Sequence, residues 1–351
     1  MDQKIENTLS TNKVVSPDDI NHFFGAMPSV DVTTMLKALI AAGLDQLPMP
    51  GQGDTIARWR ILAAVAAHNL SLLKLYEGHT DALAILHEIG GFATPENSVW
   101  GTWCAEPPDA RVLLRADTTS TEVRLSGRKA WCSGAKDISH ALVSCWNIAS
   151  EPCLAAVQLD QPGVTITSDG WHAVGMADSA SVDTLFKNAK AVQIGLPHAY
   201  LRRPGFWHGG AGIAACWFGA ASALAAALHQ QLRQLPPTVA ADPYRLLHLG
   251  SIDVALTAAA AVMRESAEAI DRRPEIDGML PALRARLAVE AAATAVLAAA
   301  TRALGAGPLC RDAQFARMAA DLPVFLRQSH AERDLAQLGK VIAGKIQPWP
   351  L

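Results

Sequence analysis

The spacing of apolar residues changes twice along this chain, near Pro95 and again near Pro204. Before the first point and after the second, apolar residues recur every three or four positions, as in amphipathic helices. Between the two points, prolines separate short runs rich in valine, threonine and leucine, which are typical of β-strands. The sequence therefore predicts an α+β multidomain protein, with an N-terminal helical domain (1–96), a middle β-barrel or sandwich domain (97–195) and a C-terminal four-helix bundle (196–351).

The helical parts carry start and stop signals. Ser16-Pro17-Asp18-Asp19 places an N-cap serine before a proline and two acids, which is typical of a helix start. The last expected helix should kink or break at Pro323, because proline removes a helical hydrogen bond. Helices are expected at 32–42, 56–77 and 80–89 and, in the C-terminal part, at 208–235, 243–272, 281–304 and 312–342.

The middle part alternates short β-like runs with turn signals. Ser126-Gly127 is expected to be a turn between the first two strands, and Gln161-Pro162-Gly163 a turn between the fourth and fifth. Strands are expected at 121–125, 128–132, 141–147, 154–159, 164–168 and 181–192.

The stretch 209–228 contains no charged residue and approaches the length of a bilayer span. It consists mainly of alanine and glycine rather than leucine, isoleucine and phenylalanine. This composition favours a helix buried among other helices, where small residues allow close approach. No membrane partner is therefore expected.

Composition argues against several partners. A chain of 351 residues that is half apolar can bury a large core, and its net charge of −3 provides no broad positive field for nucleic acid. The N-terminus lacks the apolar run of a secretory signal, which predicts a cytoplasmic protein. The six cysteines are scattered singly and the histidines lack metal-binding spacing, so we expect free thiols and no metal site.

Three segments of the middle part occur together in a distinctive order. They are WCAEP at 103–107, LSGRKAWCSG at 125–134, and Gly175-Met176 followed by FKNA at 186–189. These segments resemble the T-E-P, L-x-G-x-K-x-W-I-T-N and L-G-M segments of the acyl-CoA dehydrogenase family. In the C-terminal part, 305–307 and 311–313 are similar to the family's G-G-x-G and R-D-A segments. The resemblance spans nearly the whole chain.

The resemblance implies an acyl-CoA dehydrogenase-like flavoprotein that binds FAD and forms a homodimer or homotetramer. It assigns cofactor-binding roles to two short segments, Trp103-Cys104-Ala105 and Trp131-Cys132-Ser133. A flat aromatic neighbour and backbone donors suit an isoalloxazine ring that becomes electron-rich on reduction. The alternative for Trp131 is a core tryptophan of a β-barrel.

Two departures from the family concern the cofactor. The family's T-E-P-x-A-G-S-D loop reads AEPPDAR here, so Ala105 replaces the threonine and the glycine and serine are also missing. Flavin contacts through backbone atoms survive these changes, whereas contacts through side chains do not. In addition, 230–250 contains no R-x-Q-F-G element, which in the family contacts the cofactor's diphosphate. We therefore expect weak cofactor affinity.

A third departure concerns the catalytic base. A dehydrogenase of this family needs a carboxylate to remove the α-proton of the acyl thioester. Counting from the R-D-A aspartate places Ala320 where many members have glutamate. Asp321 is rotated by about 100° on a helix and would lie on its surface, solvated or in an ion pair. His208, near the family's alternative base position, is the remaining candidate, and its alternative role is capping or packing at a helix start.

Three functions remain open. The first is a divergent FAD-dependent oxidoreductase that acts on an acyl thioester, such as an acyl-CoA, or on another small organic molecule. The second is a scaffold of the same fold that binds a ligand and no longer turns over. The third is a flavin-dependent monooxygenase, which needs no α-proton base because reduced flavin reacts with oxygen.

Overall fold

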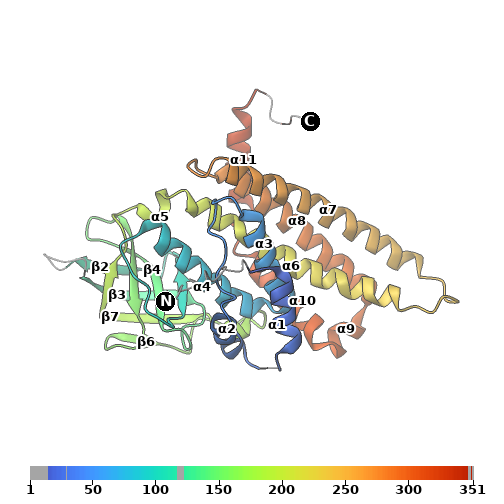
Figure 1. The fold of residues 1–351 in the computed structure, drawn as a ribbon, viewed down its shortest axis with the longest axis horizontal. Helices are drawn as coiled ribbons and strands as arrows, with labels where there is room; N and C mark the ends of the chain where they lie inside the picture. The colour runs from blue at the N-terminus through green and yellow to red at the C-terminus, as the bar shows by residue number, and fades with distance from the viewer. Residues whose placement is uncertain (1–14, 29, 117–121, 347–348, 350–351) are drawn as a thin grey trace, which may run out of the picture.

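The computed structural model describes residues 15–28, 30–116, 122–346 and 349. Helices come first, strands follow and helices close the chain, in the order predicted from the sequence. Figure 1 shows the strands at one end of an elongated molecule and the long helices α6 (Gly205–Arg233), α7 (Pro243–Arg272) and α8 (Met279–Leu304) at the other, with α3 (Thr55–His68) and α4 (Leu70–Ile89) between them. One apolar core continues through all three parts.

The N-terminal helices begin as the sequence signals predict. α1 (Pro17–Ala26) starts at Ser16, whose side chain accepts from the Asp19 N–H in a capping box. α2 (Val32–Ala41) follows. The single helix expected at 56–77 is wrong, because the chain breaks at Asn69. There the backbone is extended, and Asn69 Oδ1 caps α4 by accepting from the Leu72 N–H at 2.9 Å.

α4 then continues without the interruption expected before Thr80. Gly78 is tolerated inside this helix because strand β1 (Trp100–Trp103) lies directly against it. A Cβ at Gly78 would be 3.5 Å from the Thr102 nitrogen, and Thr102 Oγ1 donates to the Gly78 carbonyl at 2.8 Å. Helix and strand are therefore held in close contact at this glycine.

The described strands form one sheet, in the order β1-β4-β2-β3-β7-β5. β5 pairs with β7 and also with β4, so β4, β2, β3, β7 and β5 close into a ring. This is the small β-barrel expected for the middle part. The remaining strands are β2 (Val112–Ala116), β3 (Glu122–Cys132), β4 (His140–Trp146), β5 (Pro152–Gln158), β6 (Val164–Ile166) and β7 (Val182–Gln193).

The strand prediction missed two strands and placed one turn wrongly. β1 and β2 were not expected, because their short runs lack a clear alternation. Ser126-Gly127 is not a turn: β3 runs through it, and its register against β7 shifts there as in a β-bulge. Gly127 has φ +134°, and a Cβ would be 2.2 Å from the Arg111 carbonyl oxygen, so the bulge needs glycine. Thr121, where the first strand was expected to begin, lies outside the described residues.

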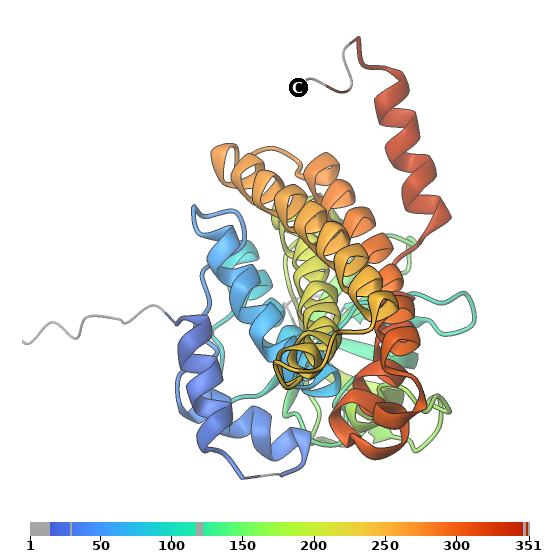
Figure 2. The ribbon, with the colours of Figure 1, turned by 90° about the vertical axis from the view of Figure 1, so that its right-hand side faces the viewer.

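The C-terminal helices follow the prediction closely except at the last one. The region 312–342 divides after Leu326 into α10 (Ala313–Leu326) and α11 (Glu332–Ala343), whereas Pro323 lies inside α10. The N–H groups of 327–329 bond to carbonyls three residues back, which tightens and ends the helix. Two short helices, α5 (Ala199–Arg202) and α9 (Ala306–Arg311), complete the chain, and α11 projects from the molecule in Figure 2.

Three of the described helices are long and apolar enough to cross a membrane by length and composition alone, namely α6, α7 and α8. The most apolar window of α6 is 72% buried, so the stretch 209–228 packs among other helices as expected. In α7 the corresponding window is only 17% buried. That helix therefore presents a long apolar face to the outside.

Candidate flavin-binding site

The first two motif segments are bonded to each other. Lys129 of β3 is fully buried, and its ammonium group donates to Glu106 Oε1 at 2.6 Å and to the Ser144 carbonyl at 3.0 Å. Trp146 Nε1 donates to the second oxygen of Glu106 at 2.8 Å. Burial alone would raise the pKa of Glu106, but the neighbouring Lys129 ammonium holds this pKa below its usual range. The two motifs thus share an ion pair that ties the β1–β2 loop to β3.

The two predicted cofactor-binding segments also meet. Trp103 at the end of β1 is buried, and its Nε1 donates to the Ser133 carbonyl at 3.1 Å. Ser133 Oγ lies 2.8 Å from Ser181 Oγ. Cys104 and Ala105, which follow β1, are half-buried. The structure therefore brings Trp103-Cys104-Ala105 beside the end of β3, as the sequence predicted.

Trp131 is not a core tryptophan. Its side chain is 50% exposed, and its backbone has φ +58°, which a bulky residue seldom adopts. It sits in a second register shift of β3, between Lys129 and Cys132, that turns the indole outward. Cys132 points the other way and is fully buried, and burial raises its pKa to about 12. An exposed indole in a strained backbone position is a surface available for stacking.

The inner side of this segment is closed. A cavity of only about 10 Å³ remains between Lys74 and Gly78 of α4, strand β1 and Ser133, which is room for about one water molecule. An isoalloxazine ring does not fit there. On the outer side, the Trp131 indole is half exposed, and it is the part of these two segments against which a flavin ring could stack from the surface. We call the segments 103–105 and 131–133 together the cradle.

Sequence reasoning missed a buried charged pair beside the cradle. Lys74 lines the small cavity together with Ser133, and its Nζ lies 2.8 Å from Glu77 Oε2 one turn further along α4. Burial raises the pKa of Glu77, with Asp81 adding to this shift and Lys74 opposing it. A buried carboxyl group with a raised pKa is a candidate acid or base. No sequence signal marked it, because helix α4 alone does not reveal which face meets β1.

His208 does not lie in the cradle. It is 2% exposed in the first turns of α6, and its contacts are with two glycines: a Cβ at Gly51 would be 2.5 Å from its Nδ1, and one at Gly278 would be 2.6 Å from its Cδ2. Burial lowers its pKa. These surroundings correspond to the packing role named as the alternative, and its catalytic role stays a prediction.

Ala320, which stands where many family members have the catalytic glutamate, lies against the Gly175-Met176 loop. A Cβ at Gly175 would be 2.2 Å from the Ala320 carbonyl oxygen, so the Gly175-Met176 loop lies directly on α10. The expectation that Asp321 lies on the surface was wrong. Asp321 is 3% exposed, and its Oδ1 accepts from the Met176 N–H at 2.6 Å. This aspartate holds the loop, because the β-barrel and α10 pack together there.

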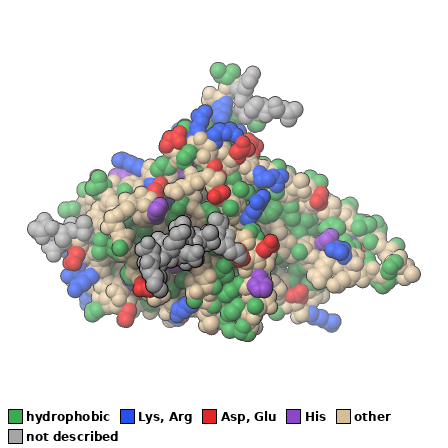
Figure 3. Space-filling view, in the orientation of Figure 1, with side chains coloured by type: hydrophobic (Ala, Val, Ile, Leu, Met, Phe, Trp, Pro, Cys, Tyr) green, Lys and Arg blue, Asp and Glu red, His purple; other side chains and the backbone are tan. Residues whose placement is uncertain are grey.

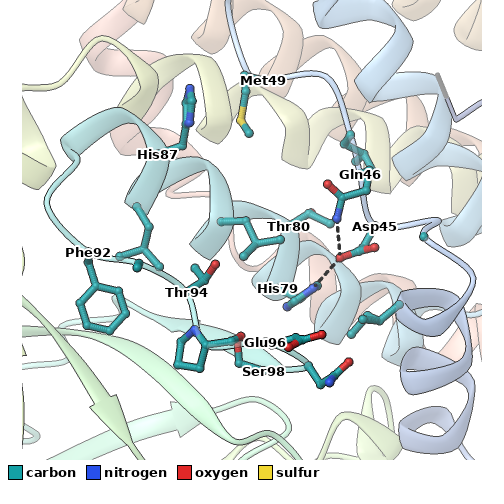
Figure 4. A pocket seen from close by; sticks show the side chains of 18 of the residues that line it. Asp45, Gln46, Met49, His79, Thr80, His87, Phe92, Thr94, Glu96 and Ser98 are labelled. Carbon is teal, nitrogen blue, oxygen red and sulfur yellow. Dashed lines mark hydrogen bonds and ion pairs between the residues drawn. The ribbon is translucent and has the colours of Figure 1, made fainter. Parts of the chain in front are cut away.

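A larger cavity, of about 640 Å³, lies elsewhere, between the loop after α2, helix α4 and residues 92–98 (Figure 4). None of the predicted cofactor-binding residues lines it. The cradle and this larger cavity are therefore two different places in the molecule.

No known family model and no curated protein matches this sequence. Solved structures do share its fold. FMN-bound TdsC of Paenibacillus sp. A11-2, a dibenzothiophene monooxygenase, superposes with a TM-score of 0.71 at 19% identity over 87% of each chain. The chain therefore has the acyl-CoA dehydrogenase-like fold that the resemblance of its motifs implied.

Two further structures agree. KijD3, solved with FMN and an amino-keto sugar nucleotide, has a TM-score of 0.74 at 19% identity over 93% of this chain and 89% of its own. The methanesulfinate monooxygenase MsuC of Pseudomonas fluorescens has a TM-score of 0.68 at 19% identity over 84% and 83%. Structures with this fold thus include flavin-dependent monooxygenases that act on small molecules.

Proposed function

We propose that this protein is an FMN-dependent monooxygenase acting on a small organic substrate. The observation that carries the proposal is the half-exposed indole of Trp131, displayed on a strained bulge beside Ser133 and the end of β1. The fold shared with FMN-bound TdsC and KijD3 supports it.

FMN is favoured over the FAD that the resemblance implies. The chain lacks the R-x-Q-F-G element with which the family contacts the cofactor's diphosphate, and FMN contains no diphosphate. The loss of that element therefore costs an FMN-binding protein nothing. It would remove affinity from an FAD-binding one.

The residues of the cradle have separate roles in this proposal. Trp131 would stack on the ring, and the backbone of Cys104 and Ala105 would provide donors to it. Reduced flavin, when bound, supplies the reaction with oxygen. Lys74, which lines the small cavity next to Ser133, is paired with Glu77, and this buried pair could hold or release a proton there. No other base is needed in place of the glutamate that is missing at Ala320, because oxygenation removes no α-proton.

The raised pKa of Glu77 supports a second candidate, the dehydrogenation of an acyl thioester such as an acyl-CoA. In that reaction Glu77 would remove the α-proton that the missing glutamate removes in the family. Oxygen separates the two functions: substrate turnover by the dehydrogenase persists under nitrogen with an artificial electron acceptor, whereas turnover by the monooxygenase stops.

We also propose that the protein acts in the cytoplasm as a homo-oligomer, with domains at 1–96, 97–195 and 196–351. The apolar outer face of α7 supports the oligomer, because monomers seldom expose such a surface. A partner subunit over this face would complete the bundle.

The decisive experiment is a titration of the purified, flavin-free protein with FMN and with FAD, followed by flavin fluorescence and thermal unfolding. FMN should bind more tightly and raise the unfolding midpoint. Trp131→Ala should weaken FMN binding by about tenfold, as expected for a lost aromatic stack. Trp349→Ala, which also removes an exposed indole, is the control. If neither flavin binds, the remaining function is that of a scaffold that binds a ligand without turnover. Tighter binding of FAD than of FMN would contradict the proposal.

A further inference from the structure

The loop before β7, residues 175–181, is bonded both to helix α10 and to the end of the cradle. On the α10 side, Asp321 accepts from the Met176 N–H at 2.6 Å. On the cradle side, the Gly134 N–H donates to the Ser179 carbonyl at 2.8 Å, and Gly134 is the residue directly after the cradle. The loop therefore joins α10 to a segment of the β-barrel that is far from it in the sequence.

A chain of three serine hydroxyls runs from this loop into the cradle. Ser179 Oγ donates to the Met176 carbonyl at 2.7 Å. Ser181 Oγ lies 2.8 Å from Ser179 Oγ and 2.8 Å from Ser133 Oγ. A hydroxyl has only one hydrogen to donate. Since Ser179 uses its hydrogen on the carbonyl, Ser181 must donate to Ser179, and Ser133 must donate to Ser181.

The chain is sheltered from water. Ser179 and Ser181 are buried, and so are Met176 and Asp321. If one of these side chains lost its polar group, its neighbour would be left with an unmet hydrogen bond that solvent does not replace. Each member of the chain therefore depends on the next.

The backbone is strained near both ends of the chain. Trp131, two residues before Ser133, has φ +58°, and Met176 has the same φ of +58°. Residues other than glycine seldom adopt such values, and they keep them only where the surrounding structure holds them. A hydrogen-bonded chain between the two positions provides such support.

Three hydrogen bonds at Ser133 and Gly134 tie the turn after Trp131 to other parts of the protein. Trp103 Nε1 donates to the Ser133 carbonyl at 3.1 Å. The other two bonds, from the Ser133 hydroxyl and from the Gly134 N–H, both lead to the loop before β7. Loss of the loop's contacts should therefore loosen this turn more than the rest of the barrel.

We propose that Asp321 and Ser181 are positioning residues of the cradle. Asp321 anchors the loop 175–181 to α10, and Ser181 connects this anchored loop to Ser133. Together they keep the Trp131 indole turned outward for stacking. They act through Ser133 and not on the ligand itself. The consequence for flavin binding rests on the function proposed above, whereas the positioning of the cradle does not.

The first measurement needs no flavin. Hydrogen exchange of the flavin-free protein, followed by mass spectrometry, reports how firmly residues 131–135 are held. Ser181→Ala and Asp321→Ala should speed exchange there by about tenfold or more, while exchange in β4 stays at the wild-type rate. Asp321→Asn keeps an acceptor for the Met176 N–H and should behave like the wild type.

Ser71→Ala is the matched control for the loss of a buried hydroxyl. Ser71 is 1% exposed, and its Oγ has no hydrogen-bond partner in the part of the chain that the structure describes. Its removal should leave exchange at 131–135 unchanged. Thermal unfolding shows whether each variant is folded at the temperature used, and Ser181→Ala carries the test by itself if Asp321→Ala is not.

The second measurement titrates the same variants with FMN. Ser181→Ala and Asp321→Ala should weaken FMN binding by about threefold to tenfold, which corresponds to the usual net contribution of one hydrogen bond. Asp321→Asn and Ser71→Ala should bind FMN like the wild type.

The outcomes separate the two proposals. Exchange at 131–135 that stays at the wild-type rate in Ser181→Ala would overturn the positioning role, and so would faster exchange spread evenly over the protein. FMN affinity that is the same in the wild type and in both alanine variants would also overturn it. If the wild type binds no FMN while exchange at 131–135 still responds to Ser181→Ala, the proposed function fails and the positioning role stands.

Discussion

At the scale of single residues, Lys129 shows that a residue of a motif can have a structural role. Its ammonium group is completely buried, whereas its partner Glu106 is partly exposed, with 32% of its side chain accessible. Removal of Glu106 leaves a charge with no water to solvate it. Removal of Lys129 leaves a carboxylate that solvent can still reach.

We therefore expect an unequal response to substitution. Glu106→Ala should cost about 3–5 kcal/mol of unfolding free energy, the usual result of leaving a buried charge unpaired. Lys129→Met, which fills the same space without charge, should cost clearly less. Urea denaturation of the two variants and of the double variant measures this. Equal losses would show that the ion pair, rather than the burial of Lys129, determines the cost.

Asp321 gives a pH prediction. Burial raises its pKa above the ordinary value of 3.8, and the Met176 N–H opposes this shift. The folded protein therefore holds the proton more tightly than the unfolded chain. The associated stability is fully present below pH 3.8 and is lost as the pH rises through the raised value.

Asp321→Asn keeps an acceptor for the Met176 N–H and cannot ionise. Between pH 4 and pH 7 its unfolding midpoint should therefore improve relative to that of the wild type. Asp321→Ala removes the acceptor and should cost about 1–3 kcal/mol at pH 4, and this cost should shrink as the pH rises, because alanine cannot ionise. Thermal unfolding across this pH range checks both, and an Asn variant that loses ground as the pH rises would contradict the assignment.

At the scale of elements, the contact of α3 with α6 depends on a glycine. A Cβ at Gly219 would be 2.2 Å from the Ala63 carbonyl oxygen, which is backbone and cannot turn aside. Gly210 in the same helix has nothing within 4 Å of the corresponding position. The two glycines offer a matched comparison in α6.

Gly219→Ala should destabilise the protein by about 1–3 kcal/mol, because the helices must move apart. Gly210→Ala should be neutral or stabilise it by about 0.5–1 kcal/mol, because alanine loses less conformational freedom in a helix. Chemical denaturation of the two variants decides between close packing and a mere helix-propensity effect. A stabilising Gly219→Ala would exclude the close approach.

At the scale of the whole molecule, the exposed face of α7 predicts assembly. Leu247 and Val254, seven residues apart and so on one helix face, are 62% and 70% exposed. Figure 3 shows hydrophobic side chains gathered over the half of the molecule that holds the long helices. A symmetric contact over this face would bury them.

Sedimentation of the wild-type protein should give an oligomer, and the double variant Leu247→Glu/Val254→Glu should shift it to monomer. Ile148→Glu changes a still more exposed apolar residue, in the turn between β4 and β5, and serves as the control. A wild-type monomer at all concentrations would refute assembly through α7. A double variant that remains oligomeric would show that the interface lies elsewhere.

Local spacing determined much of this protein in advance. The helix, β, helix order, the bounds of α7 and the capped start at Ser16 follow from periodicity and capping, which act between residues close in the sequence. The break at Asn69 and the end of α10 after Leu326 were not predictable in this way. At each place, capping or turn hydrogen bonds compete with helical hydrogen bonds of similar strength. The sequence alone does not show which of the two sets forms.

Part of the candidate site could likewise be predicted from the sequence, and part of it could not. The sequence identified the segments at 103–105 and 131–133, and the resemblance to the acyl-CoA dehydrogenase family implied that they lie together. It did not reveal that Trp131 faces outward, that Lys74 lines a small cavity together with Ser133, or that Asp321 is buried beneath Met176. Those facts depend on which face of α4 meets β1 and which turn of α10 meets the barrel, and only long-range packing of the folded chain fixes these contacts.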